Sequence, residues 1–182
     1  MKDPMVLHVD EQDNVIGFVP KLQAHQEGLL HRAVSILLFN EKGEWLLQKR
    51  ADEKYHSGGL WSNSCCSHPY PHEEVQDAAQ RRLIEEMGID CSLKKMYSFT
   101  YRAVLDNELT EHEIDHLFFG ISSDLPKINE DEVSEYKYIS KEDLEKDIML
   151  YPETYTEWFK IIYADIERKN ISNFEKLIHI AS

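Results

Sequence analysis

The amino-acid sequence predicts an α+β domain whose mixed β-sheet is flanked by helices. Strand-like apolar segments fill the first two-thirds of the chain, one helical pattern interrupts them, and further helical patterns follow at the end. This succession of strands and terminal helices is typical of the α+β class. The 182 residues suit a single core, and no linker rich in Gly, Pro and Ser divides them. We therefore expect one domain over residues 1–182.

The first strands are predicted from short apolar segments. Residues 5–9 and 14–19 lie on either side of a polar stretch, which indicates an opening β-hairpin. Residues 33–39 are almost continuously apolar, as is typical of a buried strand. A turn at 40–43 then leads to a second strand at 44–50. No element is assigned to the segment that follows.

The later elements begin with a helix. Apolar residues between 73 and 87 have helical spacing, and Gly88 marks the C-terminal end of this helix. Further strands are predicted at 97–105, 114–122 and 133–139. Helices are predicted at 141–147 and from Pro152 along an apolar series that ends at Ile166.

Charge and composition exclude several classes of partner. The net charge is −14 at pH 7, and such a surface repels nucleic acid and anionic lipid. No apolar stretch approaches the roughly 18 residues of a membrane span, and the N-terminus shows no signal-peptide core. Three cysteines, of which Cys65 and Cys66 are adjacent, make no disulfide framework. The sequence predicts a cytoplasmic, reduced protein that needs bound cations or a basic cluster to take an anionic substrate.

The predicted inner helix carries the strongest local motif. Glu73 stands eight residues before Arg81, and the pair Glu85-Glu86 lies near the helix end. Carboxylates placed in this way can hold Mg²⁺, which bridges diphosphate oxygens. A merely solvated helix would explain the charges but not their spacing. The pattern over residues 67–89 resembles the Nudix box, which implies a Nudix-like α/β/α sandwich with an N-terminal hairpin and C-terminal helices.

Two residues depart from the box. Ser67 stands where the box has its first Gly, and Arg82 stands where it has the Glu of Arg-Glu-aliphatic. The second departure replaces a carboxylate that would assemble further metal with a cation that can grip phosphate. It therefore favours holding a diphosphate over cleaving it.

A second motif narrows the resemblance to one family. The segment Ser62-Asn63-Ser64-Cys65-Cys66-Ser67-His68-Pro69 resembles the Thr-Asn-Ser-x-Cys-x-His-Pro segment of the type 1 isopentenyl diphosphate isomerases. Further matches to this family are Tyr101-Arg102-Ala103, Glu111-His112-Glu113, the histidines His25 and His31, and Trp158. The resemblance extends over residues 5–165.

The resemblance implies three groups of site residues. The catalytic group is Cys66, Glu113, Tyr101 and Trp158. One Mn²⁺ or Zn²⁺ would be held by His25, His31, His68, Glu111 and Glu113. Glu86 would hold Mg²⁺ against the diphosphate, which Lys21, Arg50, Lys54 and Arg82 would contact. The family uses no flavin, acts on a small-molecule diphosphate and is commonly monomeric.

The implied reaction interconverts isopentenyl and dimethylallyl diphosphate. Protonation of an unactivated alkene gives a tertiary carbocation that water would trap, so the site needs an acid, a base, cation stabilisation and dryness. The resemblance has Cys66 and Glu113 exchange the two protons from opposite faces of the alkene. Tyr101 would polarise Glu113 or relay a proton, and Trp158 would face the cation.

A metal site is also suggested without the resemblance. Glu111 and Glu113 share one face of the chain if their segment is extended, because strand side chains alternate. Together with His25, His31 and His68 they offer mixed nitrogen and oxygen ligands, which suit Mn²⁺, Zn²⁺ or Fe²⁺ rather than Ca²⁺. Taken singly, however, a histidine is more often a surface or core residue than a ligand.

Three other interpretations compete with the isomerase. A Nudix hydrolase of a nucleoside diphosphate derivative predicts a Glu in place of Arg82 and no need for Cys66. A non-catalytic domain with structural zinc leaves the box helix and Trp158 unexplained. A cysteine hydrolase built on Cys66 and His68 lacks an oxyanion hole and an orienting partner. Cys65 and Cys91 are interpreted as packing residues, and no role is assigned to Glu108, His112, Asp115 or His116.

Overall fold

The computed structural model describes residues 4–171, so the ends of the predicted domain 1–182 lie outside the described residues. The elements in chain order are β1 (Met5–Val9), β2 (Val15–Pro20), α1 (Lys21–Glu27), β3 (His31–Phe39), β4 (Trp45–Arg50), β5 (Trp61–Ser62), β6 (Cys65–Ser67), α2 (Val75–Met87), β7 (Leu93–Val104), β8 (Thr110–Ile121), β9 (Val133–Ile139), α3 (Lys141–Leu150), a 3₁₀ turn (Pro152–Thr154) and α4 (Glu157–Arg168). No helix within this part of the chain is long and apolar enough to cross a membrane.

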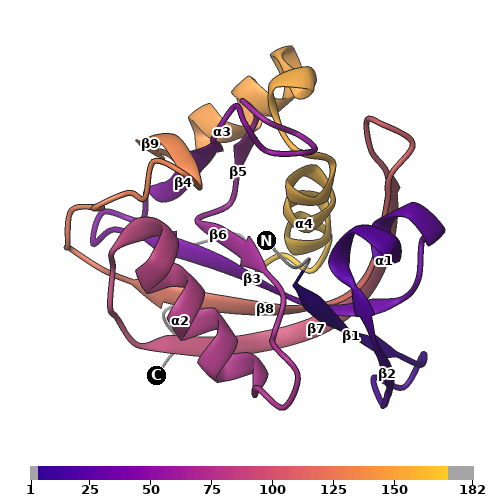
Figure 1. Ribbon diagram of the computed structural model, residues 1–182. Coiled ribbons are helices and arrows are strands. Elements are labelled where there is room, and N and C mark those ends of the chain that lie inside the picture. The colour runs from indigo at the N-terminus through magenta and orange to yellow at the C-terminus, as the bar shows by residue number, and fades with distance from the viewer. Residues whose placement is uncertain (1–3, 172–182) are drawn as a thin grey trace.

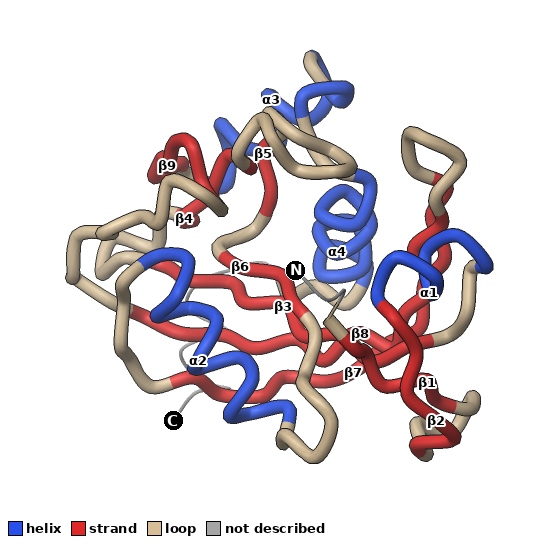
Figure 2. The backbone as a smooth tube through the Cα atoms, viewed as in Figure 1, coloured by secondary structure: helices blue, strands red, loops and turns tan. Residues whose placement is uncertain are grey.

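β3 is the central strand of a mixed sheet (Figure 2). It runs parallel to β8 along its whole length, from His31 opposite Glu113 to Phe39 opposite Ile121. On its other side β3 pairs with three antiparallel strands in succession along its length: β1 first, then β6, then β4. The predicted mixed sheet is confirmed, and its central strand is bordered by both the β6 motif segment and β8.

Helices α2 and α4 cover opposite faces of this sheet (Figure 1). Because side chains alternate along a strand, successive residues of β3 enter different cores. Ile36 and Leu38 pack in one core with Leu83 of α2. Leu37 packs in the other core with Phe159 of α4. The predicted α/β/α arrangement therefore follows from the continuous apolar run of β3, which has one core on each side.

The C-terminal helix begins later than the sequence predicted. Pro152 opens a short 3₁₀ turn, and α4 starts at Glu157. Thr156 caps α4, since its hydroxyl accepts a hydrogen bond from the Phe159 backbone N–H at 3.4 Å. The intervening Tyr155 is extended and bridges to Trp61. The prediction of one continuous helix from Pro152 was wrong because this strand-like contact separates the two elements.

Three short elements near the site were not predicted at all: helix α1 and the strands β5 and β6. Helix α1 occupies 21–27 between Pro20 and Gly28, and the latter has the left-handed φ of 62° that ends helices. Strand β6 spans only 65–67. All three are too short to show a period in the sequence. The boundaries of β8 also differ, since this strand begins at Thr110 rather than at 114.

Candidate active site

The candidate site lies on the face of the sheet that α4 covers. On this face of β8, Glu111, Glu113 and Asp115 come first, and Leu117 and Phe119 follow. The last two belong to the hydrophobic core shared with α4. The polar half of β8 therefore lies on the same face as that core. The prediction that Glu111 and Glu113 share one strand face is confirmed.

Strand register brings further side chains to the same place. Glu113 lies opposite His31 of β3 and opposite Tyr101 of β7. Cys66 of β6 lies opposite Ser35 of β3. Because directly paired residues point to the same face, the motif cysteine and the glutamate approach one pocket from the two sides of β3.

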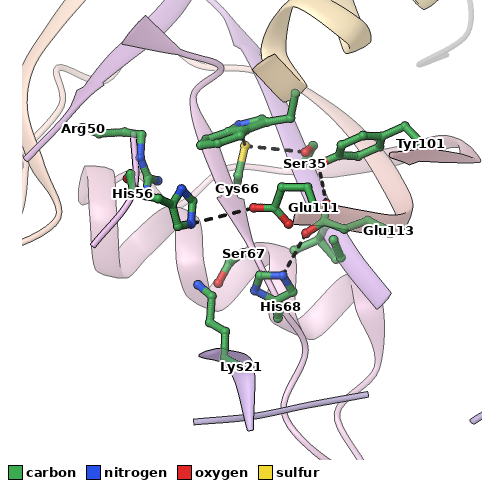
Figure 3. Close-up of a pocket in the computed structure, with 13 residues that line it drawn as sticks. Lys21, Ser35, Arg50, His56, Cys66, Ser67, His68, Tyr101, Glu111 and Glu113 are labelled. Atoms are coloured by element: carbon green, nitrogen blue, oxygen red, sulfur yellow. Dashed lines mark hydrogen bonds and ion pairs between the residues drawn. The ribbon is translucent and has the colours of Figure 1, made fainter. Parts of the chain in front are cut away.

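The pocket between the sheet, α1 and α4 is narrow, with a cavity volume of about 30 Å³ (Figure 3). Its lining residues are Lys21, Ala33, Val34, Ser35, Arg50, His56, Cys66, Ser67, His68, Tyr101, Glu111, Glu113 and Trp158. The lining thus contains all four residues of the predicted catalytic group, two of the four predicted diphosphate contacts and three of the five predicted ligands of the Mn²⁺ or Zn²⁺ site.

A group of three histidines and two glutamates adjoins the pocket, and we call it the His/Glu cluster. One ligand atom from each of its members lies within 4.8 Å of all the others. The members are His25, His31, His68, Glu111 and Glu113. They come from α1, β3, β8 and the segment after β6, so only the tertiary structure assembles them.

The ring orientations in the cluster suit a cation. His25 Nδ1 lies 2.6 Å from the Lys21 carbonyl oxygen, and His31 Nδ1 lies 2.8 Å from that of Leu29. Nδ1–H bonded to a carbonyl leaves Nε2 with a free lone pair, the arrangement usual for metal-binding histidines. Both Nε2 atoms and Oε2 of Glu111 are buried and face one another as acceptors, with 2.9 Å between His25 Nε2 and Glu111 Oε2. Since such groups are costly unless compensated, the cluster fits a divalent cation.

Glu113 links the cluster to the pocket. Its Oε1 lies 2.9 Å from His68 Nε2, and its Oε2 accepts a 2.6 Å hydrogen bond from the Tyr101 hydroxyl. Burial raises the pKa of Glu113, but the neighbouring His31 imidazole and the Tyr101 hydroxyl outweigh burial, so the pKa is lowered overall. Burial raises the pKa of Tyr101 well above its ordinary value, so its hydroxyl keeps its proton.

Cys66 is held at the other side of the pocket. Its thiol donates to Asn63 Oδ1 at 2.7 Å and receives the Trp158 indole N–H at 3.1 Å. The same N–H lies 2.9 Å from Ser62 Oγ. Burial, with a smaller contribution from the charge of Asp115, raises the pKa of Cys66 to about 12. The side chain is therefore a neutral thiol at neutral pH and can give up or return a proton.

Two of the predicted diphosphate contacts, Lys21 and Arg50, reach the pocket (Figure 3). Burial lowers the pKa of Lys21, although the charge of Glu111 opposes this effect. The Arg50 guanidinium lies 5.0 Å from the centre of the Trp158 ring. Both cations therefore stand beside the catalytic group, where an anion in the pocket can meet them.

The other predicted contacts form a separate group, which we call the box network. Its members are Gln48, Lys54, Arg82, Glu86 and Glu132, and none of them lines the pocket. Arg82 donates to Glu86 at 2.5 Å, and Gln48 donates to the other oxygen of Glu86 at 2.8 Å. Glu132 accepts from Lys54 and lies 3.4 Å from Arg82. The structure thus pairs these charges with one another.

Sequence reasoning missed two buried residues at the site. His56 lines the pocket with 3% of its surface exposed, and burial, together with the charge of Arg50, lowers its pKa to about 3. Asp115 is fully buried, and burial raises its pKa well above the ordinary value. For Asp115 the signal was available, since it continues the alternation that begins at Glu111 and Glu113. The sequence around His56 shows no comparable pattern.

Comparison with known proteins identifies the family of this chain. The model of the NUDIX domain family matches residues 29–159. A protein of Pectobacterium atrosepticum, an isopentenyl-diphosphate Delta-isomerase, is 52% identical over 161 residues, which cover 88% of this chain and 90% of that protein. An isopentenyl-diphosphate Delta-isomerase 2 of Photorhabdus laumondii is 50% identical over 176 residues, covering 97% of this chain and 99% of the relative.

Solved structures bear on the fold alone. The DR0079 structure from Deinococcus radiodurans superposes with a TM-score of 0.65 at 19% identity, covering 80% of this chain and 89% of its own. The MutT protein of Methanosarcina mazei gives a TM-score of 0.63 at 24% identity, covering 78% and 95% respectively. The predicted Nudix-like fold is confirmed.

Proposed function

This chain belongs to the isopentenyl-diphosphate Delta-isomerases with a NUDIX domain, and from that premise we propose how its pocket performs the isomerisation. The observation that carries the proposal is the placement of Cys66 and Glu113, which enter one buried pocket from strands on opposite sides of β3. The reaction adds a proton to one alkene carbon and removes a proton from another. Two proton-exchanging groups that line one buried pocket meet that requirement.

Cys66 and Glu113 are the proposed pair for the two proton transfers. The Cys66 thiol is neutral at physiological pH, and Glu113 is bonded to the Tyr101 hydroxyl at 2.6 Å. In one direction of the reaction one member donates its proton and the other accepts one, and the reverse direction exchanges their roles. Tyr101 keeps Glu113 oriented and can relay its proton, because the bond joins the two side chains directly.

The carbocation is the species the pocket has to protect. Trp158 lines the pocket with 3% of its surface exposed, and its N–H is bonded to Ser62 and Cys66. These bonds hold the indole plane beside the reacting thiol. A cation that develops within about 6 Å of an aromatic face is stabilised, and more strongly in a desolvated site. We assign this role to Trp158.

We assign the His/Glu cluster to one divalent cation, Mn²⁺ or Zn²⁺, because mixed imidazole and carboxylate ligands suit these ions. When bound, this cation would stabilise negative charge on Glu113 and so strengthen it as an acid. The protein's own part is to fix the ligand geometry through the backbone bonds of His25 and His31.

The diphosphate is proposed to lie between the pocket and the box network. Lys21 and Arg50 stand at the pocket, and Lys54 and Arg82 lie in the network with Glu86, the proposed Mg²⁺ ligand. Arg82 occupies a position where the box has a carboxylate, and this favours binding the diphosphate over cleaving it. The hydrolase alternative is less supported for the same reason.

The test is an NMR assay of the purified protein with isopentenyl diphosphate, Mg²⁺ and Mn²⁺ in deuterated water. Conversion to dimethylallyl diphosphate with deuterium in the product is expected, since solvent protons pass through the exchanging groups. Release of phosphate or of the monophosphate would instead support the hydrolase. Metal-loaded protein that changes nothing would contradict the enzymatic function.

A further inference from the structure

The two carboxylate oxygens of Glu111 face different partners. Oε2 lies 2.9 Å from His25 Nε2 and 3.8 Å from His31 Nε2, on the side of the His/Glu cluster. Oε1 lies 3.8 Å from Nε2 of His56, a residue outside the cluster (Figure 3). The side chain of Glu111 is thus divided between a cation site and a neighbouring imidazole.

His56 is held firmly enough to orient another side chain. Its backbone carbonyl accepts a hydrogen bond from Arg50 at 3.3 Å. Its ring meets the Trp158 ring edge-on, with 5.7 Å between the ring centres and an angle of 84°. Its Nδ1 lies 3.3 Å from the Ser57 hydroxyl. If that hydroxyl donates to Nδ1, the ring proton is on Nε2, the atom that faces Glu111.

The loop that carries His56 is bound to the same hairpin that carries Glu111. The Asn107 side chain donates to the Tyr55 carbonyl at 3.2 Å, and the Ser57 backbone N–H donates to the Asp106 carboxylate at 3.3 Å. Ser57 and Asn107 have left-handed φ values of 52° and 56°. Residues other than glycine keep such costly conformations only where their surroundings enforce them. Both sides of this junction are therefore constrained.

We propose that His56 is a positioning residue for the His/Glu cluster: its Nε2–H faces Oε1 of Glu111 at ion-pair distance and favours the orientation in which Oε2 points at the cation. Groups that orient a metal ligand from outside the coordination sphere change metal affinity about 10- to 100-fold when removed. The inference rests on the proposed function only in giving the cluster a divalent cation. It adds a residue that the site motifs do not include.

The test is a titration of substrate-free protein with Mn²⁺, comparing His56→Gln, His56→Asn and His56→Ala. A glutamine amide nitrogen can reach the position of Nε2, whereas an asparagine amide reaches only that of Nδ1. We expect Ala and Asn to weaken Mn²⁺ binding about 10- to 100-fold and Gln to restore most of the affinity. His72→Ala is the control, because His72 is exposed, packs on Phe18 and should leave binding unchanged.

Two results would overturn the inference: wild-type Mn²⁺ affinity in His56→Ala, or a Gln variant as weak as Asn and Ala. Thermal melting accompanies each titration, and if the Ala variant does not fold, the Gln and Asn pair decides the question. The readout is independent of turnover. A wild-type protein that fails to isomerise the substrate while the three variants keep the expected order would end the proposed function and leave His56 in its role.

Discussion

The His/Glu cluster and the box network differ in how their charges are satisfied. In the cluster, three buried ligand atoms face only other ligand atoms and make no hydrogen bond, namely Nε2 of His25, Nε2 of His31 and Oε2 of Glu111. In the box network, Glu86 is bonded on both oxygens, and Lys54 and Arg82 share Glu132. The first region is organised in advance for an added cation. The second is neutralised internally and has to exchange partners before it can hold an anion.

This difference follows from the elements that carry each region. The cluster is held by backbone bonds at Nδ1 and by the central strands, so its ligands stay in place at a cost of about 1–3 kcal/mol for each unpaired buried group. Arg82 and Glu86 of the network lie one turn apart on α2, and Lys54 comes from a loop. Long side chains on a helix and a loop can change partners easily. We therefore expect variants in the two regions to affect different steps.

The largest effect is expected from Cys66→Ala in the pocket beside the cluster. Loss of one of the two proton-exchanging groups should reduce turnover about 10³-fold or more, while the domain stays folded. The matched control is Cys65→Ala, because Cys65 packs in the core on the α2 face and has no access to the pocket. Deuterium incorporation followed by NMR measures both variants. A fully active Cys66→Ala would remove Cys66 from the mechanism.

The raised pKa of Cys66 predicts a nearly inert thiol. An ordinary thiol pKa is 9.0 and that of folded Cys66 is about 12, so at pH 8 its thiolate fraction should be about 10³-fold below that of the unfolded chain. The folded pKa is higher than the unfolded one, so folding favours the protonated thiol. The contribution of Cys66 to the free energy of unfolding is therefore complete below pH 9 and is lost as the pH rises toward 12. The rate of alkylation by iodoacetamide in a Cys65→Ala, Cys91→Ala background measures the thiolate fraction of Cys66. Equal rates in native and urea-unfolded protein would contradict the prediction.

Metal binding should separate the two regions directly. His31→Ala removes a ligand atom from the cluster, and we expect Mn²⁺ affinity of the substrate-free protein to fall about 100-fold. Glu86→Gln should leave this affinity unchanged, because Glu86 belongs to the box network. Isothermal titration with Mn²⁺ provides the measurement. The distinction between the regions fails if both variants lose the same affinity.

Arg82 is expected to act on substrate binding rather than on chemistry. Arg82→Gln should raise the KM for isopentenyl diphosphate about tenfold, with a smaller change in kcat, since a charge-assisted contact to phosphate is lost. The control is Arg81→Gln on the same helix. Arg81 is bonded to Glu73 at 2.7 Å, so this variant should lower the melting temperature and keep the KM. A KM that rises equally in both variants would place the effect in helix stability.

The smallest effect tests partner exchange in the box network. Glu132→Gln removes the charge that Lys54 and Arg82 share, so both cations become freer to bind diphosphate. A partly exposed ion pair contributes about 1 kcal/mol or less, and the KM should therefore fall about two- to fivefold. Steady-state kinetics at fixed ionic strength measure it. A raised KM would indicate that Glu132 holds the cations in their working positions.

The helices and long strands were predictable where the chain has a clear period. The apolar spacing from 73 to 87 predicted α2 to within two residues, and the apolar run at 33–39 predicted a buried strand that the structure extends to His31. The start of α4 was misplaced, because Thr156 rather than Pro152 caps it. Helix α1 was missed since a helix of only seven residues between Pro20 and Gly28 is too short to show a period.

The site was predictable from motifs to a different degree in each region. For the His/Glu cluster, residues assigned by resemblance and by ligand chemistry meet within 4.8 Å. For the box network, the family resemblance named Lys54, Arg82 and Glu86 but not their partners Glu132 and Gln48. Glu132 directly precedes β9 and Gln48 lies in β4. Both are distant from α2 in the sequence, and no local spacing relates them to it.

The sequence by itself determined the family, the ligand types and the alternation that puts Glu111, Glu113 and Asp115 on one face, since these depend on residue identity and on the strand period. Only the tertiary structure decided which partner each oxygen of Glu111 meets. His25 and His56 each face a different oxygen of Glu111, from segments that β3 and β4 separate in the chain. Local periodicity cannot predict these contacts of Glu111, because the contacts depend on strand register and on a loop that is bonded to the β7–β8 hairpin.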